Sequence, residues 1–261
     1  MIVIAHLSDI HIDLDDGQRS IGRARAVMEY LEGLPYDLDA VLVTGDIADH
    51  GLPAEYEQAR ELLASRHPVL VCPGNHDERA AFRESLLGRP RSSAPVNQVH
   101  RAAGFTVALC DSSVPGKDEG FLEEETLAWL EDVLDATPSG VPVLVGFHHP
   151  PALLHSPFLD GIRQFGAERL ADLVDRHPAA VVAFLAGHAH TPAATAFAGR
   201  PLLVAPGVVS TLRLPWEQRA HPEDHVHLDA PPALAFHVLD DAGRLTTHYR
   251  TVTAPAGSAW W

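Results

Sequence analysis

The stretch Val69-Leu70-Val71-Cys72-Pro73-Gly74-Asn75-His76-Asp77 decides how the chain is organised. Its apolar half is rich in β-branched residues and is followed at once by Pro-Gly and then by polar residues. That pattern predicts a buried strand that delivers polar side chains to its C-terminal end. In α/β proteins this end of a parallel sheet is where sites are built. The stretch therefore predicts a strand followed by a functional loop.

The same pattern occurs four more times in the chain. In each case an apolar run ends and a short motif with Asp or His follows directly. The runs and their motifs are 2–7 before Asp9 and His11, 40–44 before Gly45-Asp46, 141–147 before His148-His149-Pro150, and 181–186 before Gly187-His188-Ala189-His190. A single polar turn of this kind is ordinary. Five of them in one chain indicate a shared site.

The order of the expected elements indicates the fold class. Helical spacing of apolar residues recurs between the runs, and the last third of the chain shows only strand-like alternation. Expected helices cover 21–31, 53–65, 78–87, 122–134 and 162–175, and further strands cover 96–100, 105–110, 193–197, 202–205, 233–239 and 244–251. Strands alternating with helices and then strands alone predict a layered α/β protein in which helices flank two packed sheets.

Length and composition suit one globular domain. The chain has 261 residues, of which 46% are hydrophobic and 21% charged, so we expect a single domain over 1–253. Residues 212–232 lack periodicity and form an expected irregular loop segment, and 254–261 form an expected tail. Because a long structureless stretch is usually functional or disordered, we expect 212–232 to lie beside the site, with a contribution across a homodimer left open.

The charge balance restricts the partners. Lys and Arg number 19 and Asp and Glu number 35, which gives a net charge of −16. This field repels polymeric nucleic acid and anionic membranes, so a phosphate substrate would need local positive charge, which bound cations would supply. No apolar run reaches membrane-spanning length, and Cys72 and Cys110 read as small buried hydrophobes, so we expect a cytoplasmic protein without membrane insertion.

The polar residues at the strand ends are candidate metal ligands. Asp9 and His11 are two apart, so in an extended segment they would project from the same side. Oxygen and nitrogen ligands without thiolates suit manganese, iron or zinc. Seven ligands are too many for one tetrahedral ion and fit two ions that share a carboxylate. The candidate ligands are Asp9, His11, Asp46, Asn75, His148, His188 and His190.

In this order the motifs resemble those of the calcineurin-like metallophosphoesterases. The matching motifs are Asp9-x-His11, Gly45-Asp46-x-x-Asp49, Gly74-Asn75-His76-Asp77, His148 and Gly187-His188-x-His190. Further stretches are similar to bacterial class III cyclic nucleotide phosphodiesterases and glycerophosphodiesterases. They are Gly45-Asp46-Ile47-Ala48-Asp49-His50-Gly51-Leu52-Pro53, Asp111-Ser112-Ser113-Val114-Pro115-Gly116 and His148-His149-Pro150-Pro151.

The resemblance implies a four-layer sandwich with a binuclear metal site. It implies that Asp9, His11 and His190 hold the first ion and that Asn75, His148 and His188 hold the second. Asp46 would bridge the ions, which would be iron with manganese or zinc, or manganese or cobalt in both sites. The family pattern selects His148 rather than His149. His76 would act beside the phosphate, oriented by Asp77.

The implied activity is hydrolysis of small phosphodiesters. The two ions would neutralise the diester and activate a water as hydroxide for attack on phosphorus. The first expected substrate is a 3′,5′-cyclic nucleotide such as cyclic AMP, and the second is a glycerophosphodiester. A broad-specificity phosphodiesterase or phosphomonoesterase is a further alternative. The alternative of a different class is a metal-stabilised scaffold that binds partners without catalysis.

Overall fold

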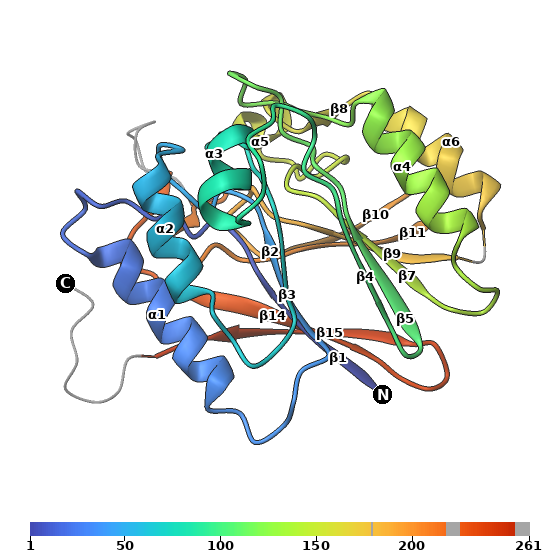
Figure 1. Cartoon of the computed structure of the whole chain (residues 1–261), viewed down its shortest axis with the longest axis horizontal. Coiled ribbons are helices and arrows are strands. Elements are labelled where there is room, and N and C mark those ends of the chain that lie inside the picture. The colour runs from blue at the N-terminus through green and yellow to red at the C-terminus, as the bar shows by residue number, and fades with distance from the viewer. Residues whose placement is uncertain (179, 218–224, 254–261) are drawn as a thin grey trace.

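Two mixed β-sheets packed face to face form the centre of the protein, and helices cover both outer faces (Figure 1). The computed structural model describes residues 1–178, 180–217 and 225–253. One sheet has the strand order β15-β14-β1-β2-β3, and the other has the order β10-β11-β9-β7-β5-β4. This is the four-layer α/β architecture that the sequence predicts.

The first sheet carries three of the five predicted strand ends. Its parallel strands β1, β2 and β3 are followed by the antiparallel pair β14 and β15, which joins the sheet beside β1. The strands are β1 Ile2–Leu7, β2 Ala40–Thr44, β3 Val69–Cys72, β14 Ala233–Leu239 and β15 Leu245–Thr251. Helices α1 (Arg19–Glu32) and α2 (Pro53–Leu62) lie on the outer face of this sheet. Because β1, β2 and β3 are parallel, their C-terminal ends meet at one edge.

The second sheet carries the other two predicted strand ends, on β7 and β9. Its strands are β4 Gln98–Ala102, β5 Phe105–Leu109, β7 Val143–Gly146, β9 Val181–Ala186, β10 Ala193–Phe197 and β11 Arg200–Val204. Strands β5, β7, β9 and β11 are parallel, while β4 and β5 form the predicted antiparallel hairpin. Helices α4 (Glu124–Asp135) and α6 (Ala167–Arg176) pack on the outer face.

Successive side chains of each strand point to opposite faces of the sheet, so the core is divided into layers under the helices and a central layer between the sheets. In β2, Val41 and Val43 pack under the helices, whereas Leu42 packs between the two sheets. Leu42 shares one buried cluster with side chains of the opposite sheet, such as Leu144 of β7. Cys72 lies in this central layer with a free thiol, and burial raises its pKa well above the usual value. Of the two cysteines, Cys110 is also free and buried, which confirms their interpretation as small core residues.

Two expected helices differ from the structure. The helix expected over 162–175 begins only at Ala167 as α6, because the short strand β8 (Gln164–Phe165) takes the place of its first turn. A separate short helix, α5 (Pro157–Gly161), lies in the stretch before it, where a loop is expected. Gly166 has φ +64°, which ends β8 and starts α6, and this conformation suits glycine. Strand β8 pairs in parallel with β6 (Gly120–Phe121), a long-range contact that local periodicity does not reveal. The helix expected over 78–87 is α3 (Arg79–Ala81) followed by the π-helical turn Phe82–Leu86.

The segment 212–232 is partly regular. Strand β12 (Thr211–Leu212) pairs with β13 (Val226–His227) in an antiparallel ladder, which shows short pairing on both sides of residues 218–224. Residues 218–224 and the predicted tail 254–261 lie outside the described residues. Among the helices of the described chain, none is long and apolar enough to cross a membrane.

A buried chain of hydrogen bonds crosses the first sheet. His6 of β1 is bonded through Nε2 to Thr44 Oγ1 at 2.8 Å and through Nδ1 to His237 Nε2 at 3.0 Å. His237 of β14 continues the chain to Thr247 Oγ1 at 2.8 Å. Burial lowers the pKa of His6 well below its usual value and that of His237 to about 3. Both imidazoles are therefore neutral in the folded protein.

This pair predicts a loss of stability in mild acid. The unfolded histidines have pKa values of about 6.5, so between pH 6.5 and 3 the unfolded chain binds more protons than the folded one. Their contribution is complete above pH 6.5, and at pH 5.5 we expect a loss of about 3 kcal/mol. Urea unfolding at pH 7.5 and 5.5, with metal chelated, measures it. If the free energy of unfolding of the H6Q/H237Q variant depends on pH as strongly as that of the wild type, these two histidines are not the cause of the loss.

Candidate metal centre

Five loops at the ends of β1, β2, β3, β7 and β9 meet where the two sheets join. Backbone hydrogen bonds tie the first two loops together, since His11 N–H donates to the Asp46 carbonyl at 2.8 Å. Gly187 N–H donates to the His148 carbonyl at 2.9 Å within the second sheet. The sheets are then linked by His188 N–H, which donates to Asp9 Oδ2 at 3.1 Å. Side chains far apart in sequence are thereby brought into one cluster.

Asp9, His11 and His190 form one group of potential ligands. One ligand atom from each lies within 4.8 Å of the others. Asp9 Oδ1 is 3.5 Å from His190 Nε2. Asp9 is completely buried, and His11 is nearly so. These are the three residues that the resemblance to the metallophosphoesterases assigns to a first metal ion.

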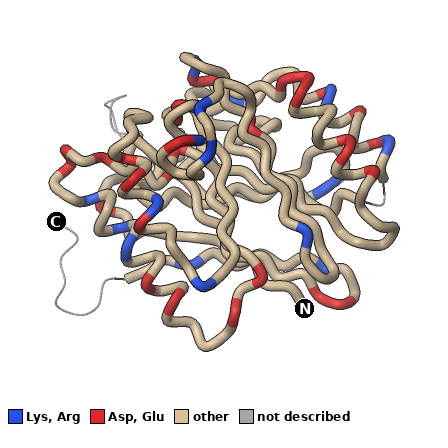
Figure 2. Tube along the Cα trace, viewed as in Figure 1, with Lys and Arg blue, Asp and Glu red and all other residues tan. Residues whose placement is uncertain are grey.

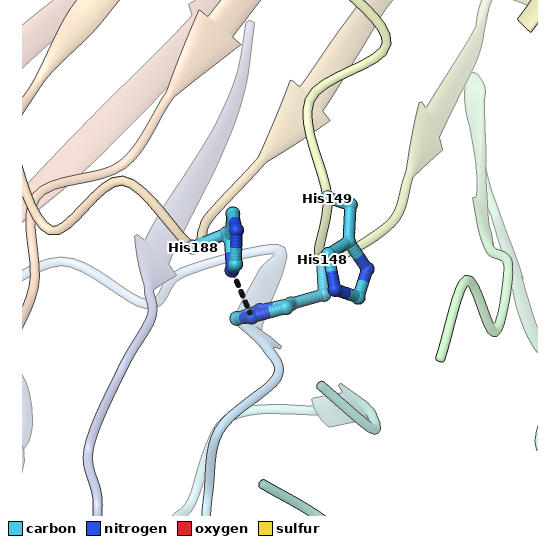
Figure 3. A group of neighbouring side chains, drawn as sticks. All are labelled: His148, His149 and His188. Atoms are coloured by element: carbon cyan, nitrogen blue, oxygen red, sulfur yellow. Dashed lines mark hydrogen bonds between the residues drawn. The ribbon is translucent and has the colours of Figure 1, made fainter. Parts of the chain in front are cut away.

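His148, His188 and Asn75 form a second group. His148 Nε2 lies 3.2 Å from His188 Nδ1 and 3.2 Å from Asn75 Oδ1 (Figure 3 shows the first of these contacts). It also lies 3.3 Å from Asp46 Oδ2, and the same oxygen is 3.4 Å from His11 Nε2 of the first group. Asp46 therefore stands between the two groups, and all seven predicted ligands converge.

Unpaired atoms indicate that the cluster is built to bind something. Three buried atoms, Asp9 Oδ1, His11 Nε2 and His188 Nε2, lack a hydrogen-bond partner in the described chain. A buried polar group without a partner costs about 1 to 3 kcal/mol, so such atoms call for a ligand. Oxygen and imidazole donors without thiolate suit divalent manganese, iron or zinc. The residues present therefore fit metal ions.

The outer nitrogens of the histidines are held by further partners. His11 Nδ1 is 2.8 Å from Asp49 Oδ1, and His190 Nδ1 is 2.9 Å from Ser210 Oγ. His148 Nδ1 donates to the Thr44 carbonyl at 2.6 Å. Such bonds fix the ring orientation and leave the opposite nitrogen for a metal. Asp49 belongs to the motif Gly45-Asp46-x-x-Asp49, but the motif alone assigns it no role. Ser210 belongs to no motif, so no sequence signal points to it.

At five of the seven predicted ligands the backbone is left-handed and not extended. The φ angles are +54° at Asp9, +47° at His11, +49° at Asp46, +66° at His188 and +53° at His190. The extended conformation expected for Asp9 and His11 is therefore wrong, although the two side chains do converge in one group of potential ligands. Non-glycine residues adopt the left-handed conformation rarely and at some energetic cost, and it concentrates at functional sites.

Charge coupling within the cluster is strong. Burial opposes ionisation of Asp46, but the charge of His148 and their hydrogen bond outweigh it and hold the Asp46 pKa well below its usual value. Burial also lowers the pKa of His148, yet the Asp46 charge and hydrogen bond prevail and raise it to about 9. Burial and the charge of His148 lower the pKa of His188 well below its usual value. Metal ions would replace the proton that these groups share.

His76 and Asp77 have separate partners in the structure. His76 Nδ1 donates to the Asp49 carbonyl at 2.8 Å, so this carbonyl orients the ring. Asp77 instead accepts from Gly74 N–H at 2.9 Å and Tyr56 Oη at 3.0 Å, and from two backbone amides of the β2 loop. Burial raises the Asp77 pKa to about 6. The expectation that Asp77 orients His76 directly is therefore corrected: Asp77 holds two ligand-bearing loops together.

A cavity of about 600 Å³ opens beside the cluster. Its polar lining includes His76 and Asp46 together with Asp13, Arg19 and Asp118. One wall is apolar and is made by Phe158, Leu159, Ile162, Leu212, Val226 and Leu228. Three of these wall residues come from the segment 212–232, which agrees with its expected position beside the site for the part that the structure describes.

Comparisons with known proteins agree with this geometry. A family model for calcineurin-like phosphoesterases matches residues 2–192. The chain belongs to this family. It is 34% identical over 253 residues to the glycerophosphodiester phosphodiesterase GpdQ of Enterobacter lignolyticus, covering 90% of this chain and 86% of that protein. It is 33% identical over 211 residues to a probable cyclic nucleotide phosphodiesterase of Rhodococcus erythropolis, covering 77% and 69%.

A solved structure shows the same fold. The crystal structure of a dimetal phosphatase from Danio rerio superposes with a TM-score of 0.67 and 18% identity, covering 97% of this chain and 99% of that one. Together with the family match, the fold makes the chain a calcineurin-like, metal-dependent phosphoesterase. Membership of this family implies two divalent metal ions, for which the Asp and His groups described above are candidates.

Close packing at Gly74 predicts a sensitive position. A Cβ atom at Gly74 would lie 2.2 Å from Asp46 Oδ1 and 2.8 Å from His148 Nε2. Gly74→Ala should therefore displace Asp46 and lower turnover by about 10²-fold, the usual cost of an ångström-scale misplacement. Elemental analysis should also show less bound metal.

Gly22→Ala is the matched control. Gly22 lies in α1, and a Cβ there would meet no atom within 4 Å. This variant should keep full activity and metal content, because alanine is the better helix former. Equal activity of the two variants would contradict the steric role of Gly74.

Proposed function

We propose that the protein is a binuclear metal-dependent phosphodiesterase acting on small phosphodiesters. The observation that carries the proposal is the convergence of seven buried or half-buried donor side chains, three of them with unpaired atoms, beside a cavity of about 600 Å³. A cavity of this size suits a nucleotide-sized molecule rather than a polymer. The metals we propose are iron with manganese or zinc, or manganese or cobalt in both positions.

The two groups of side chains support one ion each. Asp9, His11 and His190 would hold the first, and Asn75, His148 and His188 the second. Asp46 would serve both, since its Oδ2 lies within 3.4 Å of His11 Nε2 and 3.3 Å of His148 Nε2. His148 is preferred to its neighbour because its Nε2 lies at the centre of the second group.

Bound metal ions would neutralise the diester and lower the pKa of a water near the phosphorus. The chain itself supplies His76, which lines the cavity and is partly exposed. The Asp49 carbonyl can only accept, so His76 Nδ1 keeps its hydrogen and Nε2 is the nitrogen that exchanges a proton. His76 would protonate the leaving oxygen or stabilise its charge.

We propose a 3′,5′-cyclic nucleotide such as cyclic AMP as the first substrate. The cavity lining includes an exposed aromatic ring, Phe158, which stacks on the His225 ring at 5.7 Å between centroids, and a base could extend this stack or take the place of His225 in it. The relative from Rhodococcus erythropolis is named for cyclic nucleotides. A glycerophosphodiester is the second candidate, because the relative from Enterobacter lignolyticus acts on that class and matches more of the chain.

Two other classes of function fit less well. Figure 2 shows Lys and Arg scattered among Asp and Glu over the described chain rather than gathered in one stripe. With a net charge of −16, this disfavours a polymeric nucleic acid partner. A non-catalytic scaffold would have no need for the full set of seven donors with unpaired buried atoms.

A panel of substrates tests the proposed function. The metal-loaded protein should hydrolyse bis(p-nitrophenyl) phosphate, lose this activity with a chelator and regain it with manganese. Cyclic AMP, a 2′,3′-cyclic nucleotide, glycerophosphocholine and p-nitrophenyl phosphate are compared in parallel. The highest kcat/KM for cyclic AMP would support our first substrate. Turnover of the monoester alone would overturn the assignment as a diesterase.

His76 should affect turnover without affecting metal binding. Neither ring nitrogen of His76 takes part in the contacts that join the two ligand groups, since Nδ1 is bonded to the Asp49 carbonyl. His76→Ala should therefore retain about two metal ions per chain, as the two-metal arrangement requires. Turnover should fall by about 10²- to 10⁴-fold, the usual contribution of a general acid or base. Elemental analysis and kinetics on the same preparation check both. Loss of one metal would show that His76 is a ligand.

A further inference from the structure

His149 lies against the metal cluster, and one of its ring nitrogens is within 4.8 Å of ligand atoms of His148 and His188. Its ring centroid is 4.7 Å from that of His148 and 4.6 Å from that of His188. Figure 3 shows the three histidines gathered from two loops, with a hydrogen bond joining only His148 and His188. His149 is completely buried, and its role is not explained by the seven-donor arrangement.

Both ring nitrogens of His149 are bonded to a different part of the chain. Nε2 is 3.2 Å from the Asp118 carbonyl, and Nδ1 is 2.9 Å from Ser112 Oγ. A carbonyl oxygen can only accept, so Nε2 carries the hydrogen. In this tautomer Nδ1 accepts from the Ser112 hydroxyl. Neither nitrogen is then left with a lone pair for a metal.

The segment held by His149 forms part of the cavity. Asp118 lines the cavity. Two residues later, the backbone of Gly120 packs directly on the His149 ring, because a Cβ there would lie 2.4 Å from the ring Cγ. The close approach requires glycine at this position. The ring therefore sets where the stretch from Asp118 to Gly120 runs.

The contact extends to the apolar wall. Gly120 N–H donates to the Arg163 carbonyl at 3.1 Å, and β6 pairs with β8 in parallel. Strand β8 follows α5, whose Phe158 and Leu159 line the cavity. Displacing Gly120 would therefore move Asp118 and the α5 wall together.

We infer that His149 is a positioning residue that sets the wall of the substrate cavity, formed by Asp118 and α5, relative to the metal centre. The inference rests on the proposed function for its kinetic consequence. It assigns His149 to substrate binding, through Asp118 and Gly120, and not to metal coordination. The alcohol group of a diester would meet this wall while its phosphate lies at the metals.

Two amide variants separate the two hydrogen bonds. In H149N the amide reaches about the position of Nδ1 and keeps the Ser112 contact, but the Asp118 carbonyl loses its donor. In H149Q the longer side chain places an N–H near the position of Nε2 and keeps that donor. We expect KM for bis(p-nitrophenyl) phosphate to rise about tenfold in H149N, the scale of one lost hydrogen bond, and less than threefold in H149Q. Both variants should keep kcat within about threefold and two metal ions per chain.

Hydrogen exchange tests the inference independently of activity. Peptides covering 112–121 and 157–165 should exchange faster in H149N than in wild type or H149Q, because the Gly120 and Gln164 amides lie in the segments that His149 holds. If the wild type has no metal-dependent activity, the proposed function fails, and the exchange data alone decide whether His149 holds the wall. Gly120→Ala, which pushes the same backbone away from the ring, provides a second route if H149N does not fold.

Three results would overturn the inference. Loss of one metal ion in H149N would make His149 a ligand. Equal KM values in H149N and H149Q would remove the role of the Asp118 bond. Unchanged exchange of both peptides in H149N and in Gly120→Ala would show that the wall is held by other contacts.

Discussion

The placement of one buried carboxylate, Asp46, is the constraint on which the rest of the structure depends. Its Oδ2 faces His11 on one side and His148 on the other, and its Oδ1 accepts from His76 N–H at 2.9 Å. A charge buried this deeply is stable only with opposite charges and hydrogen bonds around it. Loops from both sheets must therefore end within a few ångströms of it, and the four-layer fold makes that convergence possible.

The fold meets this demand through its backbone. Left-handed residues turn the chain sharply after β1, β2 and β9, at Asp9, Asp46 and His188 among others, directly after a buried strand. Asp77 ties the β2 and β3 loops through three backbone amides, and Asp49 and Ser210 orient the outer nitrogens of His11 and His190. The strain is local, and the hydrogen bonds around it hold the conformation.

Sequence reasoning recovered the strand ends because an apolar run followed by a polar motif is a local signal. The two sheets, the helical layers and the gathering of polar residues at the strand ends follow from it, and all are present in the structure. The position of Asp46 beside His148 is implied by the family resemblance and is also present. Sequence reasoning failed where tertiary contacts decide. His11 N–H donates to the Asp46 carbonyl, and Asp77 accepts from backbone amides of the β2 loop. Strand β8 forms only by pairing with β6, and all of these contacts join residues far apart in the sequence. The cavity wall combines α5 with the segment 212–232, which no local pattern could join.

The central claim is that two metal ions share Asp46. The most direct test is an anomalous scattering map of metal-loaded crystals, collected at the absorption edges of the bound metals. The account predicts two peaks about 3.5 to 4 Å apart, the spacing of two-metal hydrolytic sites, with the Asp46 carboxylate touching both. A single peak, or two peaks of which one is not in contact with Asp46, would contradict it.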